Sequence, residues 1–263
     1  MNGPLRLACV LAHPDDETLN AGGILARYAA EGVETYVITA TRGEGAWPGD
    51  AEAYPGQRAL ARLREQELRE AARVLGLQDV VLLNYAHGEL DQASPAGAIG
   101  QIVGHLRRMR PQVVVTFDPY GSYGHPDHVA ICQFTTAAVV AAANPAYASS
   151  NGWPSHQVSK LYYMANTPPL VDLYRAAVGA GNDERQAVAW PAWSVTTRVD
   201  TSAHWQAVWQ ALACHRSQLQ AYEALRDAPE GQRRLWSAPT FYRVFSLVNG
   251  GRKLETDLFD GLR

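Results

Sequence analysis

Residues 12–17 read AHPDDE, and this stretch follows directly on the apolar run at residues 5–12. A continuous apolar run of this length is typical of a strand that is buried on both faces of a sheet. Similarly, GHPDH at residues 124–128 follows the apolar run at residues 113–117. Imidazoles and carboxylates at the ends of two buried strands predict a metal site that is assembled from distant parts of the chain.

Each motif also has a plainer interpretation, in which it does no more than open a helix. Proline is tolerated in the first helical turn, where its missing N–H costs no hydrogen bond, and acidic side chains are favoured there by the helix dipole. The same HPD core follows two separate strand-like runs, however, and capping alone gives no reason for that repetition. Chemistry at both strand ends is therefore the stronger interpretation.

The spacing within each motif narrows the choice of ligands. Residues three apart in a first helical turn share a face, so His13 can point the same way as Asp16. The same spacing separates His125 from His128. Two imidazole nitrogens and a carboxylate oxygen suit zinc, which in catalytic sites keeps three protein ligands and one open position. Spacing leaves open whether Asp15 or Asp16 is the ligand, and which histidine of the second motif binds.

Strand-like and helix-like segments alternate along the first 143 residues, which predicts a Rossmann-like α/β fold with a mostly parallel sheet flanked by helices. The expected strands are 5–12, 33–41, 80–83 and 113–117, and the expected helices are 18–31, 57–75, 95–109 and 125–143. In the mononucleotide-binding half of such folds the strand order is 3-2-1-4. The metal site is therefore expected at the carboxyl ends of strands 1 and 4.

The remaining residues, 144–263, are expected to complete the sheet and to shape the pocket, so that residues 1–263 form a single domain. Strands are expected at 160–164 and 241–248, a helix at 201–225, and loops at 145–157 and 179–194. The Gly- and Pro-rich residues 43–56 form a candidate mobile loop that can meet a substrate.

Composition limits the expected partners. The 263 residues carry a net charge of −3, so no basic excess indicates binding to nucleic acid. No apolar run approaches the roughly 20 residues of a membrane span, and no targeting segment precedes the first strand. The three cysteines lie far apart, which predicts buried thiols and a cytoplasmic protein. We expect a small-molecule substrate. We also expect a homo-oligomer, although no particular residue points to it.

The two histidine motifs resemble those of the PIG-L/LmbE family of zinc-dependent N-acetylglucosaminyl deacetylases. Other stretches within the first 135 residues agree with this family, namely Gly22-Gly23, TRGE at residues 41–44, and residues 64–76. HRSQ at residues 215–218 resembles a weaker H-x-S-Q element of the family, and the role of His215 stays open.

The resemblance implies a role for the residues of the first motif. It implies that zinc is held by His13, Asp16 and His128, with iron(II) as an alternative metal inside cells. Asp15 then becomes the general base that accepts a proton from water. These assignments follow from the matched positions of the motifs.

The resemblance also implies roles around the metal. Tyr123 and His125 are expected to stabilise or protonate the tetrahedral intermediate, and Asp127 to orient a neighbouring imidazole. Arg64 matches an arginine that contacts the sugar in relatives. Where many relatives carry an aspartate before a glycine, this chain has His87. How His87 recognises sugar hydroxyls is therefore an open question.

These residues predict a zinc-dependent hydrolase that removes the acetyl group from the nitrogen of an N-acetylglucosamine derivative, with the synthesis of a thiol precursor as one setting. An amidase that cleaves thiol–sugar conjugates is the alternative within the family. A non-haem iron oxygenase also uses two histidines and a carboxylate, but usually on a β-barrel. A nucleotide-binding sensor would use the same crevice, but the first loop lacks G-x-G-x-x-G.

Overall fold

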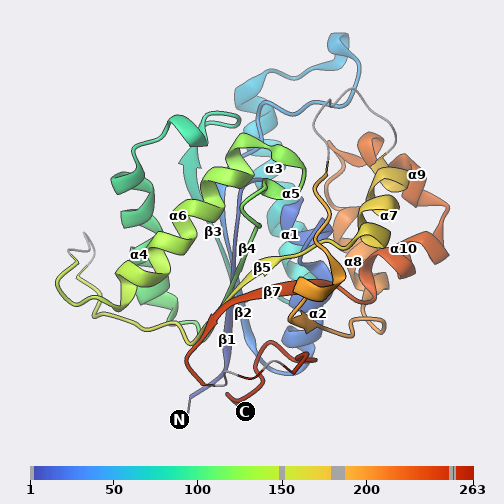
Figure 1. Cartoon of the computed structure of the whole chain (residues 1–263). Coiled ribbons are helices and arrows are strands. Elements are labelled where there is room, and N and C mark those ends of the chain that lie inside the picture. Colours follow the sequence, from blue (N-terminus) through green and yellow to red (C-terminus); the bar gives the residue numbers. More distant parts are fainter. Residues whose placement is uncertain (1–2, 148–151, 179–186, 249–250, 252) are drawn as a thin grey trace.

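A seven-stranded sheet forms the centre of the molecule, in the order β3-β2-β1-β4-β5-β7-β6 (Figure 1). The computed structural model describes residues 3–147, 152–178, 187–248, 251 and 253–263. The strands are β1 Arg6–Leu11, β2 Glu34–Thr41, β3 Asp79–Tyr85, β4 Val113–Thr116, β5 Lys160–Met164, β6 Thr197–Arg198 and β7 Thr240–Ser246. The pairs among β1 to β5 are parallel, and β7 is antiparallel to both of its neighbours. The expected mostly parallel sheet is confirmed, including the order 3-2-1-4.

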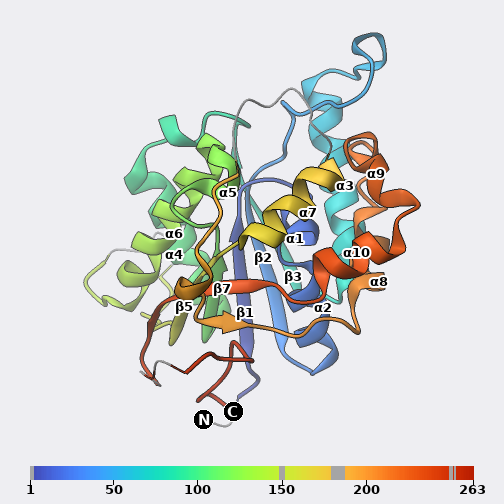
Figure 2. The ribbon, with the colours of Figure 1, turned by 45° about the vertical axis from the view of Figure 1, so that its right-hand side comes forward.

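Helices cover both faces of this sheet (Figures 1 and 2). α4 and α6 pack on each other on one face, whereas α2, α3 and α8 contact one another on the opposite face. The helices are α1 Asp16–Leu19, α2 Gly22–Ala30, α3 Gln57–Leu75, α4 Pro95–Met109, α5 Gly121–Gly124, α6 Pro126–Ala143, α7 Pro168–Val178, α8 Trp205–Leu212, α9 Glu223–Arg226 and α10 Pro229–Trp236. Single turns of 3-10 helix are Ala51–Ala53, Leu90–Gln92, Ala192–Ser194 and Leu219–Tyr222.

The central strands β1 and β4 are buried because each lies between two other strands and helices cover both faces of the sheet. β1 pairs with β2 on one side and with β4 on the other, so that Cys9 stands opposite both Val37 and Val115. All of β4 and every residue of β1 except Arg6 are buried. Both strands therefore appear in the sequence as continuous apolar runs.

Residues 144–263 continue the same sheet through β5, β7 and β6. A buried ion-pair network ties these strands to the last residues of the chain. Lys160 Nζ and Arg243 Nη1 lie 2.7 Å and 2.6 Å from Glu255 Oε1, and Tyr162 Oη donates to Oε2 at 2.7 Å. One sheet built from both halves supports our proposal that the whole chain is a single domain.

The helix expected at residues 18–31 is wrong as a single element. α1 ends at Leu19, and α2 begins only at Gly22. The carbonyl of Leu19 accepts hydrogen bonds from Tyr174 Oη at 2.8 Å and from Trp236 Nε1 at 3.3 Å. These tertiary contacts compete with the next helical turn, and they come from residues that local sequence patterns do not reveal.

The helix expected at residues 201–225 is also wrong in its extent. α8 ends at Leu212, and the chain then turns so that Ser217 can donate two hydrogen bonds to Glu67 of α3. No glycine or proline marks this turn, and for that reason it was not expected. The helices α7 and α10 and the short strand β6 were not expected either.

Loops join the helices and strands at the carboxyl edge of the sheet. The loop at residues 43–56 projects beyond the strand ends (Figure 2). Of the expected loops 145–157 and 179–194, positions 148–151 and 179–186 lie outside the described residues. Within the part of the chain that the structure describes, no helix is both long and apolar enough to cross a membrane.

Candidate metal centre

The two motifs meet at the carboxyl edge of the sheet. β1 ends at Leu11 and its parallel neighbour β4 ends at Thr116. The loop after β1 carries His13 and leads into α1, whereas the segment after β4 leads through α5 into α6, whose first turn carries His128. Two adjacent strands therefore bring together imidazoles that are 115 positions apart in the sequence.

Three buried side chains converge on one point at this edge. His13 Nδ1 lies 3.1 Å from His128 Nε2 and 3.6 Å from Asp16 Oδ2. His128 Nε2 lies 3.6 Å from Asp16 Oδ1. A tetrahedral zinc ion with bonds of about 2.0–2.1 Å places its ligand atoms about 3.3 Å apart. The separations and the donor set therefore fit one such ion.

Asp127 hydrogen-bonds to the ring nitrogen of His13 that points away from His128. His13 Nε2 donates to Asp127 Oδ2 at 2.9 Å, which leaves Nδ1 of His13 facing His128. The same carboxylate accepts the backbone N–H of Gly88 at 2.7 Å and that of Leu90 at 2.9 Å. A carboxylate in this position is the usual outer partner of a metal-binding histidine, because it fixes the tautomer and the ring orientation.

The electrostatics of the cluster are those of a cation site. Burial, together with the neighbouring His13 and His125, lowers the pKa of His128 well below the ordinary histidine value. Neutral imidazole is the form that binds a metal. Burial and the charge of Asp15 raise the pKa of Asp16 well above the ordinary aspartate value. A cation between these groups would favour the ionised carboxylate and relieve that cost.

Asp15 stands beside the cluster in an uncommon backbone conformation, with φ 97° and ψ −28°. Its Oδ2 accepts hydrogen bonds from Tyr222 Oη at 3.0 Å and from Arg64 Nη2 at 3.3 Å. Burial raises the pKa of Asp15, while the positive charges of Arg64 and His215 oppose that rise. A buried carboxylate with a raised pKa is suited to accepting a proton.

Arg64 was expected to contact the sugar, and the structure places its guanidinium inside the protein. Arg64 is almost fully buried on α3. Its Nη1 donates to the carbonyl of Gly43 at 2.6 Å, and its Nη2 donates to that of Pro14 at 2.5 Å. These bonds, with the contact to Asp15, tie two loops at the strand ends to α3.

Three more of the expected residues surround the cluster. The ring of His87 lies 4.5 Å from that of His13, and the ring of His125 lies 4.7 Å from it. Tyr123 lies in the kinked α5 segment, with its ring 5.2 Å from His128. The structure thus gathers the aromatic residues of the expected site around the three candidate ligands.

His125 also offers an alternative ligand set. Ring nitrogens of His13, His125 and His128 lie within 4.8 Å of one another. Nδ1 of His125 accepts the backbone N–H of Asp127 at 3.1 Å, which occupies the one lone pair of that nitrogen. Asp16 Oδ2 also accepts a backbone N–H, that of His13 at 2.8 Å, but a carboxylate keeps further lone pairs, and its two oxygens approach one imidazole nitrogen each. We therefore favour Asp16 as the third ligand and keep His125 for a role beside the metal.

Sequence reasoning missed Tyr222 and left the role of His215 open. Tyr222 contacts Asp15 from the second half of the chain, although nothing in the local sequence marks it. His215 is fully buried and lies 2.7 Å from Glu17 Oε1. The H-x-S-Q element was the only sequence signal that pointed to His215.

The fold and the cluster together define a class: α/β proteins with a His–Asp metal site at the point where the strand order of a parallel sheet reverses. The sequence profile of the PIG-L family, described as GlcNAc-PI de-N-acetylase, matches residues 8–139. This chain belongs to the PIG-L family, and the expected family is thereby confirmed.

A curated relative supports this assignment, and solved structures share the fold. A 1D-myo-inositol 2-acetamido-2-deoxy-alpha-D-glucopyranoside deacetylase from Kineococcus radiotolerans is 32% identical over 306 positions, which cover 100% of this chain and 84% of the relative. The N,N'-diacetylchitobiose deacetylase from Pyrococcus horikoshii has a TM-score of 0.70 at 20% identity, covering 91% of this chain and 83% of that one. A 4-carboxy-2-hydroxymuconate hydratase from Pseudomonas putida shares the fold, with a TM-score of 0.67 at 18% identity over 94% and 99% of the two chains.

Proposed function

We propose that this chain is a zinc-dependent deacetylase that hydrolyses the N-acetyl amide of an N-acetylglucosamine derivative. The observation that carries the proposal is the convergence of His13, Asp16 and His128 at separations that fit one zinc ion. Membership of the PIG-L family and the 32% identity to an inositol-linked acetamido-glucose deacetylase support an acetamido sugar joined to inositol as the substrate.

The proposed base is Asp15. A zinc ion held by the three ligands would act as a Lewis acid and lower the pKa of a bound water to about 7. Asp15 would accept a proton from the attacking water, because it adjoins the proposed ligand Asp16 at the end of β1 and its burial raises its pKa. Arg64 and Tyr222 both bond to Oδ2 of Asp15, so they orient this carboxylate.

Tyr123 and His125 are the proposed donors to the acetamide oxygen, on which negative charge develops during attack. A well-placed donor of this kind is worth about 3–4 kcal/mol in the transition state. Collapse of the tetrahedral intermediate breaks the C–N bond, and the departing amine must gain a proton from Asp15 or from His125. Asp15 and His125 are both buried, so bulk water does not compete with the amine for the proton that they donate.

The other residues of the site are proposed to position the reacting groups or to recognise the sugar. We propose that Asp127 fixes the ring of His13, because its carboxylate is itself held by two backbone N–H groups. We propose that His87 faces the sugar, since its ring lies beside that of His13. We propose that Arg64 orients the base through its hydrogen bond to Asp15. The contact of Arg64 with the sugar, which the family resemblance implies, stays a prediction.

Amine release tests the proposal. The purified chain is stripped of metal with a chelator, reloaded with zinc or iron(II), and mixed with N-acetylglucosamine, N,N'-diacetylchitobiose or 1D-myo-inositol 2-acetamido-2-deoxy-α-D-glucopyranoside. We expect zinc to restore release of amine, fastest from the inositol conjugate, and we expect His128→Ala to bind less zinc and to be inactive. Absence of amine from every acetamido sugar with zinc-loaded protein would refute the proposal.

Other outcomes of this experiment identify the alternatives. Cleavage of a thiol–sugar conjugate without loss of acetyl groups would identify the amidase, and oxygen uptake with iron(II) would identify an oxygenase. Neither outcome is favoured by a particular contact in the site. The role in thiol-precursor synthesis, the homo-oligomeric state and the cytoplasmic location stay predictions.

A further inference from the structure

Asp15 has to be held in place, because its backbone lies in the left-handed region with φ 97°. For a residue with a Cβ atom this conformation is strained and persists only when surrounding contacts impose it. The backbone N–H of Asp15 donates to Glu17 Oε2 at 2.9 Å. The side chain of Glu17 therefore fixes the peptide that carries the proposed base.

Glu17 is held in turn by His215. Nε2 of His215 donates to Glu17 Oε1 at 2.7 Å, and Thr18 Oγ1 donates to the same oxygen at 2.6 Å. Glu17 and His215 are both 0% exposed, so solvent does not replace this hydrogen bond. The imidazole of His215 thus determines where the Glu17 carboxylate stands, although 198 positions separate the two residues.

The turn that presents His215 is itself anchored. Ser217 donates its backbone N–H to Glu67 Oε1 at 2.9 Å and its hydroxyl to Glu67 Oε2 at 2.6 Å. Gln218 Nε2 donates to the carbonyl of Ala46 at 3.1 Å. His215 therefore projects from a fixed platform, as a residue that positions a catalytic group requires.

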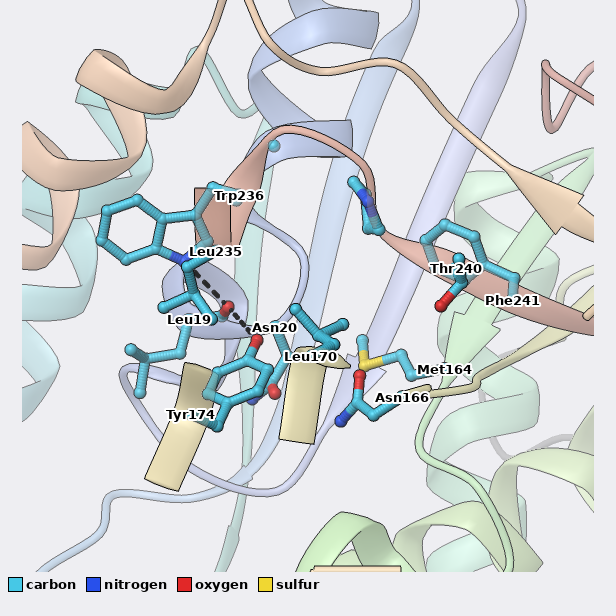
Figure 3. A pocket seen from close by; sticks show the side chains of 13 residues that line it. Leu19, Asn20, Met164, Asn166, Leu170, Tyr174, Leu235, Trp236, Thr240 and Phe241 are labelled. Atoms are coloured by element: carbon cyan, nitrogen blue, oxygen red, sulfur yellow. Dashed lines mark hydrogen bonds between the residues drawn. The ribbon is translucent and has the colours of Figure 1, made fainter. Parts of the chain in front are cut away.

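The far end of α1 is held by the same half of the chain. Figure 3 shows the carbonyl of Leu19 between Tyr174 and Trp236, which both donate to it. A cavity of about 20 Å³, enough for one water molecule, lies next to these side chains. Residues from the second half of the chain therefore hydrogen-bond to α1 near both of its ends, at Glu17 and at Leu19.

We propose that the Glu17–His215 pair is a positioning device that keeps Asp15 aligned for proton transfer. The proposal rests on the proposed deacetylation, in which Asp15 is the base. A displacement of about 1 Å at a reacting group can cost about 100-fold in rate even when the change lies outside the chemistry. Loss of the donor at position 215 should therefore lower kcat, while substrate binding and zinc binding persist.

Paired substitutions at His215 separate positioning from packing. His215→Phe keeps a ring of similar shape but removes the donor, whereas His215→Gln keeps an N–H donor that reaches about as far. We expect kcat for amine release to fall about 10- to 100-fold in His215→Phe, with KM and zinc content unchanged. His215→Gln should recover most of the lost kcat.

The matched control is His156→Phe, because His156 is also buried and its ring donates a hydrogen bond to the carbonyl of Pro111, away from the site. It should lower the melting temperature and leave kcat unchanged. If His215→Phe does not fold, His215→Asn, which is polar but too short to reach Glu17, replaces it in the comparison with His215→Gln.

The outcomes distinguish the two proposals. A wild-type chain that is loaded with zinc but releases no amine would refute the deacetylase function. An active wild type, with a folded His215→Phe or His215→Asn variant of equal kcat, would refute only the positioning role. The positioning role would also be refuted if kcat fell in proportion to the zinc lost, or if His215→Gln did not recover kcat.

Discussion

Nε2 of His13 and Oδ2 of Asp127 lie 2.9 Å apart, so a residue of the first motif is oriented by a residue of the second, 114 positions later. Asp127→Asn should weaken zinc binding about 10- to 100-fold, because outer carboxylates of this kind contribute that much to metal affinity. Competition with a fluorescent chelator measures the change. Unchanged zinc affinity would mean that the pair does not act on the metal site.

Asp15→Asn should keep zinc and lose turnover. The amide has the size of the carboxylate but cannot accept a proton, and positioned general bases contribute about 10²- to 10⁴-fold to rate. Single-turnover amine release measures this loss, and metal analysis of the same sample shows whether zinc is retained. Turnover equal to that of the wild type would remove Asp15 as the base.

His87→Asp should alter the preference among sugars. A carboxylate accepts hydrogen bonds from sugar hydroxyls, and a bond to a charged group contributes enough for about a 10-fold change in kcat/KM. The comparison uses N-acetylglucosamine and its epimers at single hydroxyls. His87→Asn is the control of equal size and no charge, and an identical profile in all three proteins would mean that this loop does not recognise the sugar.

Glu255→Gln should destabilise the fold in a way that depends on pH. Burial alone would raise the pKa of Glu255, but hydrogen bonds from Lys160, Tyr162 and Thr197 outweigh it and lower the pKa. A carboxyl group whose pKa is lowered by folding stabilises the protein above its unfolded pKa, about 4.3, and this stabilisation is lost as pH falls through the folded value.

We therefore expect Glu255→Gln to cost about 3 kcal/mol at pH 7, as for other broken buried pairs, and to cost less near pH 3. Urea unfolding at both pH values measures the difference. Glu230→Gln is the control, because the pair of Glu230 with Arg233 is exposed, and it should change little. A constant cost of Glu255→Gln across pH would contradict the assignment.

The sequence predicted the core of the site because the information there is local. His13 and His128 lie in motifs that follow the apolar runs of β1 and β4, so the sequence places them at strand ends. The preferred strand order then brings these two ends together. The same reasoning left the choice between Asp15 and Asp16 open. The hydrogen bonds of Asp15 to Arg64 and Tyr222 distinguish the two environments.

The contacts that hold α1 could not be predicted in this way. His215 meets Glu17, and Tyr174 meets Leu19, only because α7 and the turn after α8 pack against the first half of the chain. Such contacts depend on long-range packing, which overrides local propensity. The break between α1 and α2 has the same origin.

The fold alone does not determine the reaction. The Pseudomonas putida hydratase and the Pyrococcus horikoshii deacetylase both resemble this chain over most of its length. Activity therefore depends on the side chains at the strand ends rather than on the sheet that carries them.

Anomalous diffraction at the zinc edge, from crystals of the zinc-loaded chain, tests the central claim most directly. The account predicts one zinc ion bonded to His13 Nδ1, His128 Nε2 and a carboxylate oxygen of Asp16, each at about 2.0–2.2 Å. A zinc ion held by other side chains, or no anomalous peak among these three, would contradict it.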